Sequence, residues 1–365
     1  MKKNIFKIKI SVWIVFSFTL FAFLSSSFSV NAQYFGQNKV RYKKLNFKVY
    51  ETPHFSLYYY LRNENLVKRF AQEAEVWYNL HQQVFRDTFA KKNPIILYAN
   101  SPDFQQTTAI QGDIGVGTGG VTEGMKNRIV MPITQLNQQT RHVMGHELVH
   151  AFQYHILMEG DSTSIENIDK IPLWMIEGMA EYLSIGKVDA YTGMWMRDAY
   201  LSKDIPTLRQ LTTSNRYFPY RYGQAFWSYV GSTYGDTVIV PFFKQAAKYG
   251  YEKALVNTFG YDEKTFSNLW KTSIESTYKP YIKDTAQAIV GKRIIDNKNA
   301  GEHYNIAPAI SPDGKYVAFL SEKDLLSIDL FLADAQTGKI LQKLTSKARN
   351  SHIDEFNFIE SAGAW

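Results

Sequence analysis

The sequence contains no cysteine, although it is 365 residues long. No disulfide can therefore stabilise the fold, and the chain cannot be a lipoprotein that is modified on a cysteine. Hydrophobic residues make up 45% of the chain, which is enough to fill at least one substantial core, and the length allows two domains. Stability must come from packing and from any metal that the chain binds.

Acidic residues are absent from the first 32 positions, which carry four of the 41 basic residues: Lys2, Lys3, Lys7 and Lys9. Without these four lysines, 37 basic residues remain against 34 acidic ones. The basic character of the chain is thus largely a property of its first segment. The net charge gives no support to a nucleic-acid-binding function, and we expect no nucleic-acid partner.

The same first segment has the pattern of a secretory signal peptide. Its lysines precede an apolar run over residues 10–24, and a serine-rich stretch then ends in Val30, Asn31 and Ala32, which resembles an A-x-A cleavage site. We expect residues 1–32 to be a signal peptide and the protein to be exported, to the periplasm or cell envelope of a bacterium. The alternative is an uncleaved anchor, for which the run is short compared with about 20 residues. Only this segment would contact a membrane.

Residues 33–285 are expected to form one α+β domain in which a small sheet precedes a helical subdomain. Alternation of apolar and polar residues predicts strands, and a 3.6-residue period predicts helices. The predicted elements are a hairpin over 46–60, a helix over about 64–88, strands over 94–98 and 128–132, a helix over about 138–157 and helices almost throughout 171–285.

The C-terminal part of the chain is expected to be all-β after a linker over residues 286–303. A Ser-Pro-Asp-Gly turn begins at Ser311, and a Thr-Gly turn begins at Thr337. Strands are predicted around these turns, over residues 316–320, 330–332 and 340–344.

Residues 304–346 resemble a blade of the TolB-like propeller family, whose repeats carry these two turns. A propeller needs about four to eight blades of about 40–45 residues. Residues 304–365 would then hold the first blade and the start of a second. We therefore expect the sequence to be truncated and the natural protein to continue as a propeller, which could gate access to the preceding domain or recruit an envelope protein partner. The alternative is a small β appendage that caps the helical domain.

The most informative motif is His146-Glu147-Leu-Val-His150 within the predicted helix over 138–157. Residues four apart on a helix lie one above the other, so His146 and His150 can bind one zinc ion. Glu147 can then take a proton from a water whose pKa the zinc has lowered from about 15.7 to about 7. The motif predicts hydrolysis assisted by a metal ion.

A catalytic zinc typically has three protein ligands, and Glu177 is the best candidate for the third. It lies in Trp174-Met-Ile-Glu177-Gly-Met-Ala-Glu181-Tyr, at the start of a helix that follows a loop. Residues 50–285 resemble the gluzincin metallopeptidases, especially the peptidase MA-like group, in which this pattern follows the HExxH helix. The resemblance implies a zincin-like fold, His146, His150 and Glu177 as ligands of one Zn²⁺ and Glu147 as the general base. It also implies that Glu181 orients a ligand imidazole, that of His146.

Two further histidines are excluded from the metal by geometry. His142 and His150 are separated by eight residues, which rise about 12 Å along a helix, so these two cannot bind the same ion through bonds of about 2 Å. His142 is expected to be packed or to support a ligand, with a separate metal as the alternative. His155 lies five residues after His150 and turns off the ligand face, so we expect it to be structural.

A glycine-rich loop and a tyrosine complete the candidate site. Residues 112–120 contain GxGxxG, but a β-like segment over residues 128–132 follows where a dinucleotide site needs a helix. The loop could lead to an edge strand that pairs with an extended peptide substrate; an ordinary flexible loop is the alternative. Tyr222 lies where the family has a tyrosine near the site and is the candidate that stabilises the oxyanion, with a core or rim aromatic as the alternative.

The sequence thus predicts an exported zinc metallopeptidase that acts on a peptide or protein substrate. One rival is an interaction protein of the cell envelope whose zinc domain is structural or inactive, although Glu147 argues against a purely structural site. Another is a metal-dependent hydrolase of a non-peptide bond, for which the site chemistry would be the same.

Overall fold

The computed structural model of the chain describes residues 43–110, 114–115, 117–158, 167–281, 291–302, 304–324, 328–345 and 365. The expected signal peptide and the expected start of a second blade, residues 347–364, lie outside the described residues. Among the described residues, no helix combines the length and the apolar character that crossing a bilayer requires.

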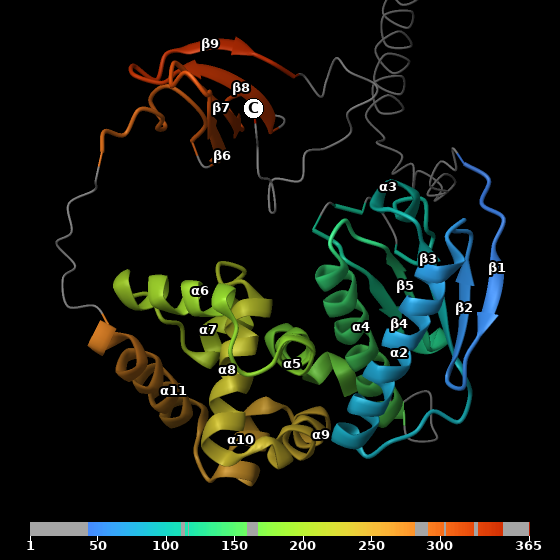
Figure 1. Ribbon diagram of the computed structural model, residues 1–365. Coiled ribbons are helices and arrows are strands. Elements are labelled where there is room, and N and C mark those ends of the chain that lie inside the picture. The colour runs from blue at the N-terminus through green and yellow to red at the C-terminus, as the bar shows by residue number, and fades with distance from the viewer. Residues whose placement is uncertain are drawn as a thin grey trace, which may run out of the picture. The chain divides into compact units, whose positions relative to one another are not determined.

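A five-stranded mixed sheet forms the first part of the fold (Figure 1). Its strands in chain order are β1 (Lys48–Glu51), β2 (Phe55–Tyr59), β3 (Asn93–Tyr98), β4 (Val121–Glu123) and β5 (Arg128–Pro132). In space their order is β1-β2-β3-β5-β4, with parallel pairing of β3 to both β2 and β5 and antiparallel pairing at the two ends. The expected hairpin and the two expected inner strands are confirmed. The strand over residues 128–132 is not the edge, because β4, which the periodicity did not predict, lies outside it.

Two long helices, α2 (Glu64–Phe85) and α4 (Asn137–Met158), pack against one face of this sheet. Inward-facing residues such as Leu57 and Ile95 are at most 1% exposed and join the same hydrophobic cluster as the helices. A smaller cluster around Phe104 lies on the opposite face, beside the short helix α3 (Ser101–Phe104). A 3-10 turn, η1 (Gly124–Lys126), connects β4 to β5. The sheet therefore supports α4, the helix that carries the motif, from one side.

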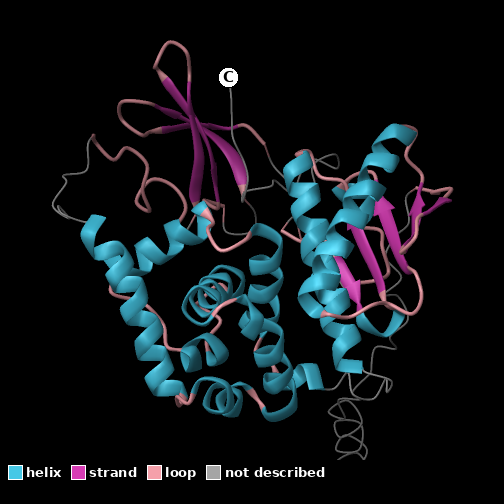
Figure 2. Cartoon of the chain, turned by 60° about the horizontal axis from the view of Figure 1, so that its bottom comes forward, coloured by secondary structure: helices cyan, strands magenta, loops and turns pink. Residues whose placement is uncertain are grey.

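The other side of α4 is covered by a helical subdomain, shown in Figures 1 and 2. Its elements are α5 (Leu173–Ile185), α6 (Ala190–Leu201), α7 (Leu208–Thr213), α8 (Pro219–Tyr234), η3 (Asp236–Val238), α9 (Ile239–Tyr249), α10 (Tyr251–Phe259), α11 (Glu263–Tyr278) and η4 (Lys279–Tyr281). The helical character expected for residues 171–285 is confirmed over the described residues. Because helices cover α4 on one side and the sheet covers it on the other, every residue from Val143 to Gln153 is buried.

In the subdomain, α5 and α8 are in close contact at two glycines. A β-carbon on Gly178 would overlap the backbone of Gly223, and one on Gly223 would overlap the carbonyl oxygen of Trp174. Neither position can carry a larger residue without separating the helices. This contact brings the first turn of α8 beside the residues of α5 that face α4.

The C-terminal part of the chain forms a four-stranded antiparallel sheet of its own. The strands are β6 (Asn305–Ile310), β7 (Tyr316–Ser321), β8 (Asp329–Asp334) and β9 (Ile340–Lys343), in this order across the sheet. Three of them are the expected strands, and β6 adds a fourth. The Ser-Pro-Asp-Gly turn is closed by Ser311, whose hydroxyl donates to Asp313 and accepts from the amide of Tyr316. A single four-stranded sheet matches one expected blade, while the propeller stays a prediction.

Candidate metal centre

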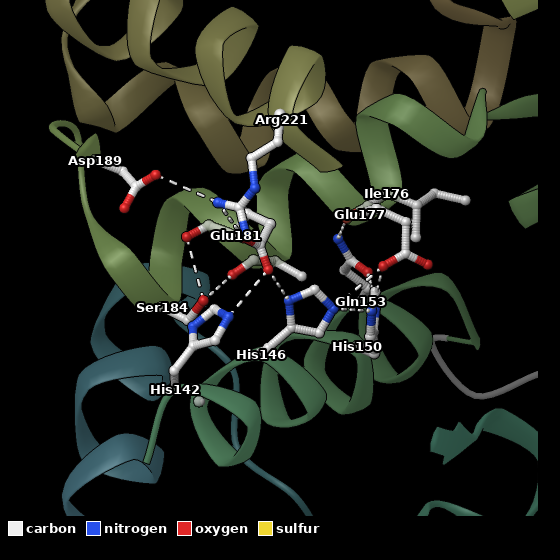
Figure 3. A network of polar contacts seen from close by, with 12 residues as sticks. His142, His146, His150, Gln153, Ile176, Glu177, Glu181, Ser184, Asp189 and Arg221 are labelled. Carbon is white, nitrogen blue, oxygen red and sulfur yellow. Dashed lines mark hydrogen bonds and ion pairs between the residues drawn. The ribbon is translucent and has the colours of Figure 1, made fainter. Parts of the chain in front are cut away.

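The three expected metal ligands meet at one point between α4 and α5 (Figure 3). The Nε2 atoms of His146 and His150 lie 3.1 Å apart, and each lies 3.2 Å from Oε2 of Glu177. Four ligands of a tetrahedral zinc, at bonds of about 2.0–2.1 Å, are separated by roughly 3.4 Å from one another. The three donor atoms are therefore spaced closely enough to bind one metal ion.

The donor set also fits a cation chemically. Two imidazole nitrogens and a carboxylate oxygen converge in a buried place, and they are the donor types of catalytic zinc sites with an open fourth position. Three such groups are costly to bury together unless a cation or protons join them. His146, His150 and Glu177 are thus the residues that would hold a metal ion.

A glutamine orients the second ligand histidine. His150 Nδ1 lies 2.8 Å from Oε1 of Gln153, and Nε2 of the same amide donates to the carbonyl oxygen of Ile176 on α5. The amide oxygen can only accept, so His150 carries its proton on Nδ1 and leaves Nε2 free to coordinate. Gln153 lies three residues after His150 on the same helix, a spacing that could have identified it in the sequence.

Glu181 supports the first ligand histidine from the opposite side of its ring. Its Oε1 lies 2.9 Å from Nδ1 of His146 and 3.2 Å from Nε2 of His142. Its Oε2 lies 3.0 Å from a guanidinium nitrogen of Arg221, which also lies 3.4 Å from Asp189 (Figure 3). His142 thus contacts the supporting carboxylate and lies away from the three-donor point, as the helix geometry predicted.

Burial and carboxylates act in opposite directions on these groups. Burial by itself lowers the pKa of His146, but the carboxylates of Glu177 and Glu181 outweigh it and raise that pKa to about 10. Burial raises the pKa of Glu177, whereas the charges and hydrogen bonds of His150 and His146 hold it far below its ordinary value. Glu181 is likewise held low, by His142 and His146, against the effect of its burial. Both carboxylates are therefore ionised across the physiological pH range.

Glu147 faces the sheet side of α4, where β4 and the glycine-rich loop lie. The hydroxyl of Thr122 on β4 lies 2.7 Å from Oε2 of Glu147 and 2.8 Å from its carbonyl oxygen. A β-carbon on Gly120 would lie 2.9 Å from Oε1 of Glu147, so this glycine leaves the space that the carboxylate occupies. The described part of the loop therefore leads to the edge strand β4, which lies beside Glu147. A dinucleotide site would need a helix directly after the loop, where β4 lies instead.

The tyrosine beside the three donors is Tyr220, whereas Tyr222, the candidate from the sequence, packs away from them. Tyr220 stacks on the ring of His146 with centroids 5.8 Å apart, and burial together with the charge of Glu177 and a hydrogen bond to it raises its pKa. Tyr222 instead packs edge-on against Tyr217 and Trp195, at 5.5 and 6.2 Å. The two tyrosines are two residues apart on α8, about 200° around the helix axis, so they face opposite sides.

One other expectation concerns a histidine near the motif. His155 pairs with Asp87, with Nδ1 2.6 Å from the carboxylate, and takes no part in the three-donor point. Arg221 and Thr122 had no signal in the sequence, because an arginine or a threonine is too common to single out without its neighbours in space. The resemblance pointed to Tyr222, and the rotation of α8 places Tyr220 beside the donors instead.

Comparison with known proteins agrees with this geometry. A family model described as Peptidase MA superfamily matches residues 80–276, which is more than half of the chain. The matched region contains α4, α5 and α8, and so every residue of the metal centre described above. No curated protein is significantly similar to the chain in sequence.

Proposed function

Because the chain belongs to the Peptidase MA superfamily, we propose that it is a zinc-dependent metallopeptidase that hydrolyses a peptide or protein substrate. The observation that carries this proposal is the convergence of two imidazoles and a carboxylate within 3.2 Å of one another, beside a glutamate on the same helix. Carboxylates that orient or neighbour the ligands are features of catalytic rather than closed structural zinc sites.

His146, His150 and Glu177 would hold the ion, with Gln153 and Glu181 fixing the two imidazole rings. When bound, zinc lowers the pKa of water from about 15.7 to about 7 and polarises a carbonyl group. The protein's contribution is to keep the ligands in place and the fourth position open.

Glu147 is proposed as the general base, which takes a proton from the attacking water and returns it to the leaving amine. Its carboxylate follows His146 directly in the chain and accepts from the Thr122 hydroxyl. That hydroxyl has one proton, so it leaves at least three of the carboxylate's four lone pairs for the reacting water. Thr122 therefore orients Glu147 without blocking it.

Tyr220 is proposed as the donor to the oxyanion that forms when the carbonyl is attacked. Its pKa is raised above the ordinary value of a tyrosine, so the hydroxyl keeps its proton at neutral pH and can donate. Its contact with His146 holds it next to the metal ligands. Tyr220 replaces Tyr222 in this role.

The edge strand β4 is proposed to bind the substrate backbone by strand addition. Its inner side pairs with β5 from Val121 to Glu123, and its outer side has no strand partner among the described residues. An extended peptide that pairs there would lie next to Glu147, because Thr122 of this strand contacts it. We also propose export, from the pattern of residues 1–32, and an envelope partner for the C-terminal sheet.

The test measures zinc content and peptide cleavage of the full chain with its Glu147→Gln and Glu252→Gln variants. We expect one zinc ion in all three proteins and cleavage of a peptide library by the wild type and Glu252→Gln alone. Glu252 is the matched control because it is exposed and pairs with Arg209 on the surface. Equal cleavage by Glu147→Gln and the wild type would refute the role of Glu147, and absence of any zinc would refute the metal centre.

A further inference from the structure

A row of aromatic rings leads from the metal centre to the surface of the helical subdomain. It begins at His146, on which Tyr220 stacks, and continues to Phe218, whose ring centroid lies 5.1 Å from that of Tyr220. Trp195 on α6 follows, 5.7 Å from Phe218. Successive rings are inclined to one another by 16°, 27° and 33°, so each ring lies closer to parallel than to edge-on against the next.

The outer members of the row are exposed despite their apolar character. Phe218 is 43% exposed and Trp195 37%, and on the same helix Tyr191 and Met194 are also exposed. Water contact with apolar surface costs about 25 cal/mol for each Å². A group of large apolar side chains that adjoins a reaction centre is a common property of ligand sites.

Trp195 packs against Tyr222, the tyrosine of α8 that faces away from the metal centre. Tyr222 packs edge-on against Trp195 at 6.2 Å, and Tyr217 packs edge-on against Tyr222 at 5.5 Å. Both tyrosines are buried, at 6% and 7% exposure. The exposed ring therefore stands on a rigid base, which lowers the entropy that ordering it would cost.

The cation next to the row, Arg221, is already paired with carboxylates. Arg221 follows Tyr220 in the chain, but its guanidinium lies within 3.4 Å of both Glu181 and Asp189. Its charge is already compensated and would attract an acidic side chain only weakly. The aromatic rings are left as the feature that an occupant would recognise.

We propose that Phe218 and Trp195 form a subsite for a large apolar side chain of the peptide substrate, an aromatic residue above all. The inference rests on the proposed peptidase function, and it adds the class of residue that is selected. The occupant is a substrate residue because the row is continuous with Tyr220 and His146 through successive ring contacts of 5.1–5.8 Å, so an extended peptide at the metal centre runs toward it.

The experiment compares peptides that carry one phenylalanine in a glycine–serine background, moved one position at a time, with the all-serine version. Cleavage is measured with the zinc-loaded full chain, and equilibrium binding with its zinc-loaded Glu147→Gln variant. The test variants are Phe218→Ala and Trp195→Ala. Leu201→Ala is the matched control, because Leu201 is 47% exposed at the far end of the same helix as Trp195.

We expect one phenylalanine position to improve both binding and kcat/KM on the order of tenfold over serine. Phe218→Ala and Trp195→Ala should each remove most of this preference, measured as the ratio of the phenylalanine peptide to the serine peptide, whereas Leu201→Ala should keep the ratio and the activity on the serine peptide. A variant that lost activity on both peptides alike would show a disturbed Tyr220 and no selective subsite. That result in both test variants, or a preference that survives both, overturns the inference.

The binding arm separates this inference from the proposed function. A phenylalanine preference in binding that depends on Phe218 and Trp195, without cleavage by the wild type, would support the subsite and refute the peptidase. Cleavage with no preference at any position would support the peptidase and refute the subsite. Absence of a preference in binding refutes the subsite whether or not cleavage occurs.

Discussion

The two sides of the His146 ring meet two glutamates of the same helix in different surroundings. On the Nε2 side, Glu177 faces the imidazoles of His146 and His150. On the Nδ1 side, Glu181 faces the imidazoles of His146 and His142. By composition the two groups are alike, because each has two histidines and one glutamate whose donor atoms lie within 4.8 Å of one another.

The difference is the cation that accompanies Glu181. Arg221 lies 3.0 Å from Glu181, and this guanidinium, reaching in from α8, already compensates the buried carboxylate. Glu177 instead meets Tyr220, a neutral hydroxyl. We therefore expect the metal ion at Glu177, whose negative charge no arginine compensates. Glu181, which pairs with Arg221, is expected to support a ligand histidine instead.

The difference in role between the two carboxylates is tested most directly by one matched pair of variants, Glu177→Gln and Glu181→Gln. Structural zinc binding is worth about 10–16 kcal/mol over four ligands, so loss of one ligand should weaken binding by roughly a hundredfold to a thousandfold. Loss of a group that only orients a ligand should weaken it by about 10–100-fold. Competition with a chelator measures both affinities. Equal losses would mean that the two carboxylates do not differ in role.

A second test uses His81, a buried histidine for which the described part of the chain supplies no carboxylate partner. It is 1% exposed and bonds through Nε2 to the carbonyl oxygen of Gly145, and its burial lowers its pKa to about 4, opposite to the change at His146. Because the unfolded chain takes up this proton near pH 6.5, stability should be full above that pH and fall as the pH drops toward 4. The loss from this group is on the order of 3 kcal/mol.

Denaturant unfolding of the metal-free chain between pH 7 and pH 4.5 measures this loss. His81→Gln should show a shallower decrease than the wild type, since the glutamine cannot take up a proton. His155→Gln is the control, because His155 is partly exposed and pairs with Asp87. Parallel curves for His81→Gln and the wild type would contradict the assignment.

A third test removes the cation of the Glu181 side with Arg221→Met. The buried carboxylate would lose its guanidinium partner, and we expect a loss of about 2 kcal/mol in the free energy of unfolding, discounted because the arginine is partly exposed. Arg209→Met is the matched control, because its partner Glu252 is exposed and its other partner, Glu263, lies 3.8 Å from the guanidinium. This variant should cost at most about 1 kcal/mol in the free energy of unfolding. Equal costs, measured by chemical denaturation, would remove the distinction between the two carboxylates.

The smallest effect is expected for His142→Gln. His142 contacts Glu181, which in turn contacts the ligand His146, so the affinity for zinc should fall by less than about tenfold. The zinc content should stay at one ion per chain. His150→Gln, which removes a ligand, is the reference for loss of metal. If the wild type binds two ions and His142→Gln binds one, a second metal occupies the Glu181 side and the comparison fails.

Much of the fold could be predicted because its segments have strong periodicities. The hairpin ahead of α2, the inner strands β3 and β5, and the limits of α4 within one residue follow from alternation and from the 3.6-residue repeat. The strand β4 could not be found this way, because three residues are too few for a period. Its position at the edge, next to Glu147, depends on pairing with β5.

Some residues of the candidate site could likewise be identified from the sequence, and others could not. His146, His150 and Glu177 could be selected from motifs whose spacing is determined by helix geometry and by the family pattern. Tyr220 could not be distinguished from Tyr222, because the choice depends on how α8 is rotated against α5. That rotation is set by the contact of Gly178 with Gly223, which no local pattern encodes.

By itself, the sequence determined which groups one helix presents together: two imidazoles and a carboxylate whose spacing follows from 3.6 residues per turn. Only the tertiary structure decided what meets them from elsewhere in the chain. Thr122 reaches Glu147 from the sheet, and Arg221 and Tyr220 reach the two glutamates of α5 from α8. The physical reason is range: a helix period acts over a few residues, whereas the charges and hydrogen bonds that distinguish Glu177 from Glu181 come from chain segments about 40 residues away, brought close by packing.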